Sequence, residues 1–254
     1  MEKKMKLAII GFGKMGKALA SAVTERGAQV CAIIDPVADE ATAREISREA
    51  LVECDVALDF SRPDAVLSNI RALSSIGKDI VVGTTGWYDK LEEAREVVKR
   101  AGNGMIWSGN FSLGVQIFFQ LLEHSAGVID RFTEYDAGVQ EIHHSQKMDS
   151  PSGTAGMIGE ILLRKISRKK SIVKGNSPAT IKPEQLQIVS QRIGSVPGTH
   201  TVMFDGPDDS IELKHTARGR QGFASGALAA AEWVRGRKGF FDIHDLISDL
   251  LQEK

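Results

Sequence analysis

The first 35 residues follow a pattern that few folds can accommodate. A continuous apolar run over residues 6–10 is typical of a strand buried on both faces. The segment Gly11-Phe-Gly-Lys-Met-Gly16 follows it, and apolar residues then recur at helical spacing until Gly27. A second apolar run over residues 30–34 leads directly to Asp35. A strand, G-x-G-x-x-G, a helix, a strand and an acid in this order predict a dinucleotide-binding α/β unit.

The three glycines of this segment have different roles in holding a dinucleotide. Gly11 permits a tight turn, Gly13 lets the backbone approach the pyrophosphate, and Gly16 lets the helix pack on the strand. The first N–H groups of the helix lack partners within it and can bind phosphates. A plain glycine turn is the alternative. The predicted cofactor contacts of this loop are Gly11, Phe12, Gly13, Lys14, Met15 and Gly16.

Asp35 bears on which nicotinamide cofactor is used. Its carboxylate would accept a hydrogen bond from the adenosine ribose and would repel a 2′-phosphate. The next residue is Pro36, where an arginine would favour NADP, although Lys14 and Lys17 could partly offset this. We therefore expect NADH to be the favoured cofactor and NADPH to be tolerated.

Strands and helices continue to alternate through the N-terminal half of the chain. Apolar runs over residues 56–60, 79–82 and 104–107 predict three further strands. A glycine-containing loop follows each of the last two, and ligands bind at such carboxyl ends in open α/β sheets. A simple glycine-rich turn is the alternative for the first loop, and an ordinary N-cap is the alternative for Asn110. The predicted cofactor contacts of the two loops are Gly83, Thr84, Thr85, Ser108, Gly109, Asn110 and Phe111.

The regular alternation stops after residue 112, and the segments that follow are mostly strands. We therefore expect an α/β protein with two domains. Residues 1–112 and 220–254 would form a Rossmann-like parallel-sheet domain, and residues 113–219 a second α+β domain on a mixed or antiparallel sheet. The elements predicted after residue 112 are strands over 134–143, 186–192, 200–204 and 210–215, a helix over 153–167, an exposed basic loop over 165–183, and helices over 223–235 and 240–251.

Composition indicates an ordinary soluble globular protein. The chain has 254 residues, 42% hydrophobic content and a net charge of −1, which give no support to a nucleic-acid or membrane-surface role. No apolar run approaches the roughly 20 residues needed to span a bilayer. Cys31 and Cys54 lie in apolar surroundings without a C-x-x-C spacing, so we expect reduced thiols in a cytoplasmic protein.

Residues 141–156 read E-I-H-H-S-Q-K-M-D-S-P-S-G-T-A-G and combine several reactive groups. A histidine titrates near neutrality and can give a proton to the carbanion-like centre that hydride addition leaves. A nearby lysine, Lys147, can stabilise negative charge or donate a proton itself. The helix expected from Gly153 offers free N–H groups to a carboxylate. The stretch therefore predicts an acid, a cation and a carboxylate site for a reductive reaction.

Two other interpretations of His143 and His144 remain. Adjacent histidines at the end of a strand are often ordinary polar residues. Imidazoles are also common metal ligands, but no H-E-x-x-H spacing, cysteine pair or carboxylate cluster completes a ligand set here. We therefore expect no metal.

The same stretch resembles the signature of the dihydrodipicolinate reductases, also called 4-hydroxy-tetrahydrodipicolinate reductases, of bacterial lysine and diaminopimelate synthesis. The resemblance extends over the whole chain, because G-x-G-x-M-G, D-F-S-R-P, G-T-T-G, N-F-S-x-G and G-F-A-S-G-A follow in the family's order. Two departures from the family pattern stand out. Many members have the longer glycine loop G-x-x-G-x-M-G, whereas Gly11–Gly16 is one residue shorter. An arginine often follows the acid that binds the ribose, whereas Pro36 follows Asp35 here, which speaks against NADP. A third departure, Ser150 in place of alanine, is expected to be silent.

The resemblance implies a role for each part of the stretch. His143 corresponds to the family's proton donor, Lys147 to a second catalytic donor and His144 to a substrate-binding position. Gly153 and Thr154 correspond to the backbone grip on a substrate carboxylate. A nicotinamide cofactor would deliver hydride to ring C4 of dihydrodipicolinate, a cyclic imine dicarboxylate. His143, assisted by Lys147, would protonate the neighbouring carbon to give tetrahydrodipicolinate. The resemblance also implies a homotetramer formed through the C-terminal sheet, and domain closure over bound ligands.

Three other functions remain open on the sequence. Another two-domain NAD(P)-dependent dehydrogenase would share only the N-terminal half of the chain. A non-catalytic, dinucleotide-sensing regulator would need a DNA- or partner-binding element, which we do not find in the sequence. A metal-dependent hydrolase would need a metal site.

Overall fold

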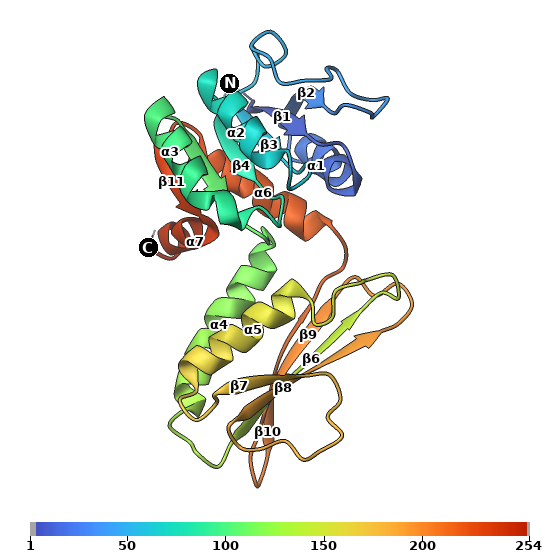
Figure 1. The fold of residues 1–254 in the computed structure, drawn as a ribbon, viewed down its shortest axis with the longest axis vertical. Helices are drawn as coiled ribbons and strands as arrows, with labels where there is room; N and C mark the ends of the chain where they lie inside the picture. The colour runs from blue at the N-terminus through green and yellow to red at the C-terminus, as the bar shows by residue number, and fades with distance from the viewer. Residues whose placement is uncertain (1–3, 253–254) are drawn as a thin grey trace. The chain divides into compact units, whose positions relative to one another are not determined.

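The computed structural model describes residues 4–252. Within them the chain divides into two compact units. One is formed by the residues up to Leu113 and those from Arg220 onward, and the other by Gly114–Gly219. Each unit is built around its own sheet (Figure 1). No helix in the described range is long and apolar enough to cross a membrane.

The first unit contains a six-stranded sheet in which every neighbouring pair of strands is parallel. Parallel sheets are normally covered on both faces, and the strands here are correspondingly apolar. The sheet order is β11-β5-β4-β3-β1-β2, with β1 (Lys6–Ile10), β2 (Gln29–Ile34), β3 (Val56–Asp59), β4 (Asp79–Val82), β5 (Gly104–Trp107) and β11 (Gly239–Asp242).

Alternate residues of β1 enter two separate hydrophobic clusters, because successive side chains of a strand point to opposite faces. Leu7 and Ile9 belong to one cluster, and Ala8 and Ile10 to the other. The predicted Rossmann-like parallel sheet is therefore confirmed. The first cluster contains α1 (Lys14–Glu25), α6 (Gln221–Val234) and α7 (Ile243–Gln252), and the second contains α2 (Val66–Ser75) and α3 (Leu91–Ala101), which follows the 3-10 turn η1 (Tyr88–Lys90).

The glycine loop leaves β1 at the point where the strand order reverses, since β2 lies on one side of β1 and β3 on the other. Ligands of open α/β sheets bind at such a point. Gly11 has a φ of +87°, and a Cβ there would lie 2.6 Å from the carbonyl oxygen of Phe60, which follows β3. Only glycine can therefore make this turn so close to the neighbouring strand.

The second unit contains a five-stranded mixed sheet, as predicted. β9 is antiparallel to its two neighbours, whereas the other two pairs are parallel. Residues of α4 (Leu113–Ile129) and α5 (Gly153–Lys165) form one hydrophobic cluster with residues of the sheet. The sheet order is β10-β9-β6-β8-β7, with β6 (Asp136–His143), β7 (Ser171–Lys174), β8 (Gln185–Arg192), β9 (Thr199–Asp205) and β10 (Ser210–Thr216).

Two predicted segments were wrong. Residues 240–251 do not form one helix, because Phe240 and Phe241 lie in β11, which pairs with β5, before α7 begins. Residues 165–183 are not simply an exposed loop. They contain β7, and the side chain of Lys169 is buried, with its Nζ 2.5 Å from Asp136 Oδ1. A strand of four residues with two apolar side chains is too short to be recognised by its pattern.

The expectation of two reduced thiols was also wrong. A disulfide joins Cys31 and Cys54, whose Cα atoms lie 5.9 Å apart. Cys31 is in β2, and Cys54 directly precedes the turn into β3. The strands β2 and β3 flank β1 on opposite sides, and the tertiary packing brings together two cysteines that are 23 positions apart.

Candidate active site

Strand β6 places the first functional side chains. Its exposure alternates strictly, so Val139, Glu141 and His143 all lie on the buried face of the sheet. His200 of β9 stands directly opposite Glu141 in the antiparallel register. The burial of Val202 and Phe204, at a spacing of two, indicates that His200 faces the same side. Two strands therefore bring one carboxylate and two imidazoles together beneath the helices.

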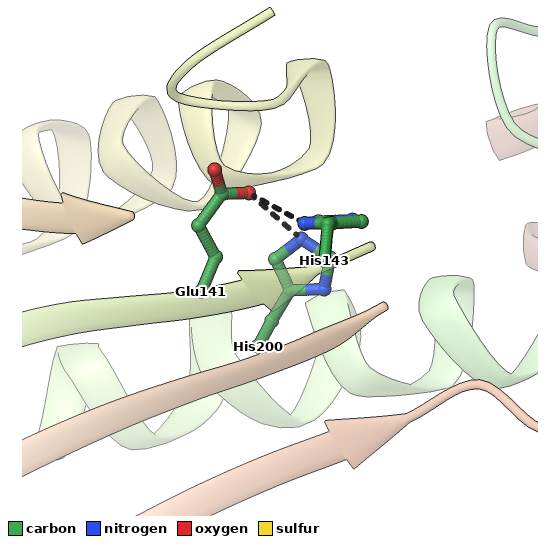
Figure 2. Close-up of side chains that lie close together, drawn as sticks. All are labelled: Glu141, His143 and His200. Carbon is green, nitrogen blue, oxygen red and sulfur yellow. Dashed lines mark ion pairs between the residues drawn. The ribbon is translucent and has the colours of Figure 1, made fainter. Parts of the chain in front are cut away.

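The three side chains meet at one oxygen of Glu141 (Figure 2). Glu141 Oε2 lies 3.3 Å from Nδ1 of His143 and 3.6 Å from Nε2 of His200. The two imidazole rings are 5.1 Å apart and nearly perpendicular. Glu141 is completely buried, and both histidines are less than a tenth exposed.

The other oxygen of Glu141 is held by two donors. The backbone N–H of Ser152 and Nη2 of Arg192 donate to Oε1 at 3.0 and 2.9 Å. Burial disfavours ionisation of this carboxyl, but hydrogen bonds from its partners outweigh that effect and hold the pKa of Glu141 well below its usual value. Glu141 is therefore an anion at neutral pH.

His143 is uncharged in the free protein. Burial is the main cause that lowers its pKa to about 4; the Glu141 carboxylate opposes this, while His200, Lys147 and Arg192 add to it. The nearby anion therefore orients the imidazole without charging it.

The loop after β6 contains the predicted cation. Nζ of Lys147 donates to Asp149 Oδ1 at 2.7 Å, and this bond is the first cause of the lowered pKa of Asp149, to which the backbone N–H of Gly153 also contributes. Ser152 caps α5 by accepting a hydrogen bond from the Ala155 N–H at 3.2 Å. Asp149 thus contacts Lys147 and the N–H of Gly153, two groups that were predicted to bind the substrate.

The other predicted substrate contacts adjoin the same loop. The half-buried His144 accepts a hydrogen bond through its carbonyl from the Lys147 N–H at 3.1 Å. Gly153 is exposed and Thr154 half-buried in the first turn of α5. The structure therefore brings all the residues predicted from this stretch to one end of β6.

Three residues of this site were missed by the sequence analysis. Glu141 was read as part of the stretch without a role, although its spacing of two from His143 on a strand indicates a shared face. His200 occupies a buried-face position in a run of alternating apolar residues, which is a weak signal. Arg192 has no local signal, because only the pairing of β6 with β8 brings it close.

The same cluster is the one group in the described chain with the geometry of a metal site. The ligand atoms of Glu141, His143 and His200 lie within 4.8 Å of one another. Glu141 thus provides a carboxylate ligand beside the two histidines, which no spacing in the sequence had indicated. However, the guanidinium of Arg192 already neutralises Glu141, and a further cation beside it would be repelled. The absence of a metal therefore stays a prediction.

The glycine loop of the first unit fits a dinucleotide. A Cβ at Gly16 would lie 2.2 Å from the carbonyl oxygen of Gly11, so the protein's own packing requires glycine there. A Cβ at Gly13 would meet nothing within 4 Å, so the space beside it is open to a ligand. Gly13 begins α1 without a side-chain cap. The exposed Lys14 and half-buried Met15 follow it in the first turn.

Asp35 ties this loop to the end of β2. Its Oδ2 accepts a hydrogen bond from the Phe12 N–H at 2.7 Å, and its Oδ1 accepts from the Val37 and Ala38 N–H groups, each at 2.9 Å. Burial disfavours the charged form, but these bonds lower the pKa of Asp35 overall. Nζ of Lys17 is paired with Glu40 at 2.8 Å.

The two further predicted loops follow the neighbouring strands β4 and β5. Thr84 is buried and its carbonyl accepts from the indole N–H of Trp87 at 2.9 Å. Asn110 uses its Oδ1 to accept from the Ser112 N–H at 2.9 Å, which favours the capping alternative for this oxygen. Of the remaining predicted contacts, Ser108 and Phe111 are buried, Thr85 is exposed, and Gly83 and Gly109 would crowd Phe60 and Tyr88 if they carried a Cβ.

Comparison with known proteins gives matches along nearly the whole chain. The family model described as dihydrodipicolinate reductase, N-terminus, matches residues 5–111, and the one described as dihydrodipicolinate reductase, C-terminus, matches residues 114–247. A 4-hydroxy-tetrahydrodipicolinate reductase of Christiangramia forsetii is 37% identical over 98% of this chain and 100% of its own length. The enzyme of the same name from Ralstonia pickettii is 32% identical over 96% of this chain and 99% of its own.

Two solved structures share the fold. Dihydrodipicolinate reductase from Paenisporosarcina sp. TG-14, with dipicolinate bound, has a TM-score of 0.77 and 22% identity, over 96% of this chain and 100% of that one. An engineered D-amino acid dehydrogenase bound to NADP+ has a TM-score of 0.59 and 13% identity, over 99% and 97% of the two chains.

The lowered pKa of His143 gives a direct prediction for the free protein. In ¹⁵N NMR spectra, the imidazole of His143 should stay neutral as the pH falls through 6 and should titrate with a midpoint of about 4. The His143→Gln variant identifies the resonance by its loss, and the urea-unfolded protein should titrate near the ordinary value of about 6.5. A folded-state midpoint near that ordinary value would contradict the arrangement.

Proposed function

The chain belongs to the dihydrodipicolinate reductase family, and on this basis we propose that it reduces dihydrodipicolinate, formed from 4-hydroxy-tetrahydrodipicolinate, to tetrahydrodipicolinate in lysine and diaminopimelate synthesis. It is an oxidoreductase that uses a nicotinamide dinucleotide. The observation that carries the proposal is a match to this one family across both units of the chain.

The first unit would hold the cofactor. The open space at Gly13 and the uncapped start of α1 suit a pyrophosphate, and Asp35 suits the ribose hydroxyls. The loops after β4 and β5 would contact the nicotinamide half. When bound, the reduced cofactor supplies a hydride. Asp35 and the pairing of Lys17 with Glu40 support NADH as the preferred form, because Lys17 is not left free for a 2′-phosphate.

The second unit would bind the dicarboxylate. A substrate carboxylate would displace Asp149 from Lys147 and from the Gly153 N–H, and would bind the N–H groups that begin α5 at Gly153 and Thr154, with His144 as a further contact. Two negative charges beside His143 raise the pKa of its imidazole. His143 would therefore take up a proton as the substrate binds and give it to the ring carbon next to the reduced one, with Lys147 assisting.

We also propose a homotetramer in the cytoplasm. The face of the five-stranded sheet opposite the core residue Val202 exposes Met203 by 41%, which supports this face as the subunit contact. The Cys31–Cys54 disulfide does not support this compartment, because disulfides are rare in cytoplasmic proteins.

Loss of either proposed donor should reduce turnover without affecting cofactor binding. With NADH and freshly generated dihydrodipicolinate, the purified chain should oxidise NADH, and His143→Gln and Lys147→Ala should each lower kcat by about 10²–10⁴, the usual cost of one acid–base group. The Kd for NADH should stay unchanged in both, because the glycine loop is intact. Turnover near that of the wild type in both variants would refute the assignment.

The cofactor preference can be measured separately. The ratio of kcat/KM for NADH over that for NADPH should exceed one, since Asp35 repels the 2′-phosphate. The Glu40→Gln variant should lower this ratio by releasing Lys17. A clear preference of the wild type for NADPH would exclude this account of Asp35.

A further inference from the structure

The buried carboxylate of Glu141 is satisfied unevenly. Oε1 accepts two hydrogen bonds, from the Ser152 N–H and from Arg192. Oε2 meets the geometry of a hydrogen bond with no donor in the described chain. Nδ1 of His143 lies 3.3 Å from Oε2 and likewise has no hydrogen-bond partner of ordinary geometry there. Nε2 of His200 lies 3.6 Å from Oε2 and also contacts Ser152 Oγ at 3.2 Å, and the side chain of Ser190 interacts with the same carboxylate. Within the described chain, the Glu141 carboxylate is thus the one group placed to be a partner for Nδ1 of His143.

This pairing determines which nitrogen of His143 carries its hydrogen. Glu141 is ionised, and an ionised carboxylate can only accept hydrogen bonds. A lone pair on Nδ1 facing Oε2 would leave the buried Nδ1 unsatisfied and set two hydrogen-bond acceptors against each other. The hydrogen of the neutral ring therefore belongs on Nδ1, and Nε2 holds the lone pair.

The surroundings of Nε2 are kept clear by a glycine. A Cβ at Gly198 would lie 3.0 Å from Nε2, closer than ordinary contacts allow, and Gly198 has a φ of +153°. The charged and titratable groups around the ring are Glu141 on β6, His200 on β9, Lys147 in the loop after β6 and Arg192 at the end of β8. Only Glu141 carries a negative charge, and it lies on the Nδ1 side.

Building on the proposed function, we propose that Glu141 is a positioning residue that holds the Nδ1–H of His143, so that the proton given to the substrate is carried on Nε2. The aspartate of a serine-protease triad acts on its histidine in the same way. Glu141 itself would touch neither substrate nor cofactor, since its side chain is completely buried.

In this arrangement, each proton and electron pair of the proposed transfer is accounted for. On binding of the dianionic substrate, Nε2 takes a proton from water and the ring becomes a cation paired with Glu141. In the protonation step the Nε2–H bond breaks and a C–H bond forms at the enamine carbon. The enamine electron pair makes that bond while the ring nitrogen of the product regains its imine double bond. His143 returns to the neutral ring with its hydrogen still on Nδ1.

Three variants separate the charge of Glu141 from its bulk and from the second imidazole. Glu141→Gln keeps the size but can donate an N–H to Nδ1, which would move the ring hydrogen to Nε2. Glu141→Asp keeps the charge at a greater distance. His200→Gln is the matched control, because it removes the neighbouring imidazole but keeps a partner for Ser152.

The readout is the tautomer of His143 in the free protein at pH 7, from two-bond ¹H–¹⁵N correlation spectra. The wild type, Glu141→Asp and His200→Gln should show hydrogen on Nδ1, and Glu141→Gln should show it on Nε2. In the assay, kcat of Glu141→Gln should fall by about 10²–10⁴ and Glu141→Asp should recover part of this loss. The Kd for NADH should be the same in all four proteins.

The wild-type spectrum alone can overturn the proposal, which keeps it testable if Glu141→Gln does not fold. Hydrogen on Nε2 in the wild type, or an unchanged tautomer and kcat in folded Glu141→Gln, would rule it out. The spectra need no substrate. A wild type that shows the Nδ1 tautomer but does not turn over dihydrodipicolinate would therefore contradict the proposed function and leave the role of Glu141 standing.

Discussion

The buried carboxylate of Glu141 is the interaction on which the active site depends. Moving one carboxylate out of water costs several kcal/mol unless other groups replace the lost hydration. Here the replacements come from four elements: His143 on β6 itself, His200 on β9, Arg192 on β8 and the backbone at the start of α5. Because the buried charge needs all of these partners, it links the register of β6, β8 and β9 with the position of α5. The same contacts that stabilise the second unit also orient its proposed proton donor.

The two units form their proposed binding sites from different kinds of group. The first unit works mainly through backbone: glycines that permit close approach, an uncapped helix start, and amides that hold Asp35. The second works through side-chain charge. Asp149 holds Lys147 and approaches the N–H of Gly153, so the free protein already contains a carboxylate where the substrate carboxylate is proposed to bind. The cation and the helix start are therefore arranged before any ligand arrives, but a substrate carboxylate must break their contacts with Asp149 to reach them.

Local patterns predicted the alternating strands and helices of the first unit, the glycine loop, and the candidate site residues between Glu141 and Gly156. Each of these predictions rests on residues that are close together in the chain. They did not predict β7 or β11, which have only two large apolar side chains each and pair with β8 and β5. Nor did they reveal Arg192 and His200, which lie 51 and 59 positions from Glu141 and reach it through strand register. The disulfide of Cys31 with Cys54 is a further contact that tertiary packing alone creates.

The central claim is that His143 is neutral when free and gains a proton when a dicarboxylate binds. Titration calorimetry of dipicolinate binding at pH 7, in buffers of different ionisation enthalpy, measures that proton directly. The account predicts uptake of about one proton per site by the wild type and almost none by His143→Gln. Binding of dipicolinate to the wild type without proton uptake, or equal uptake by both proteins, would contradict it.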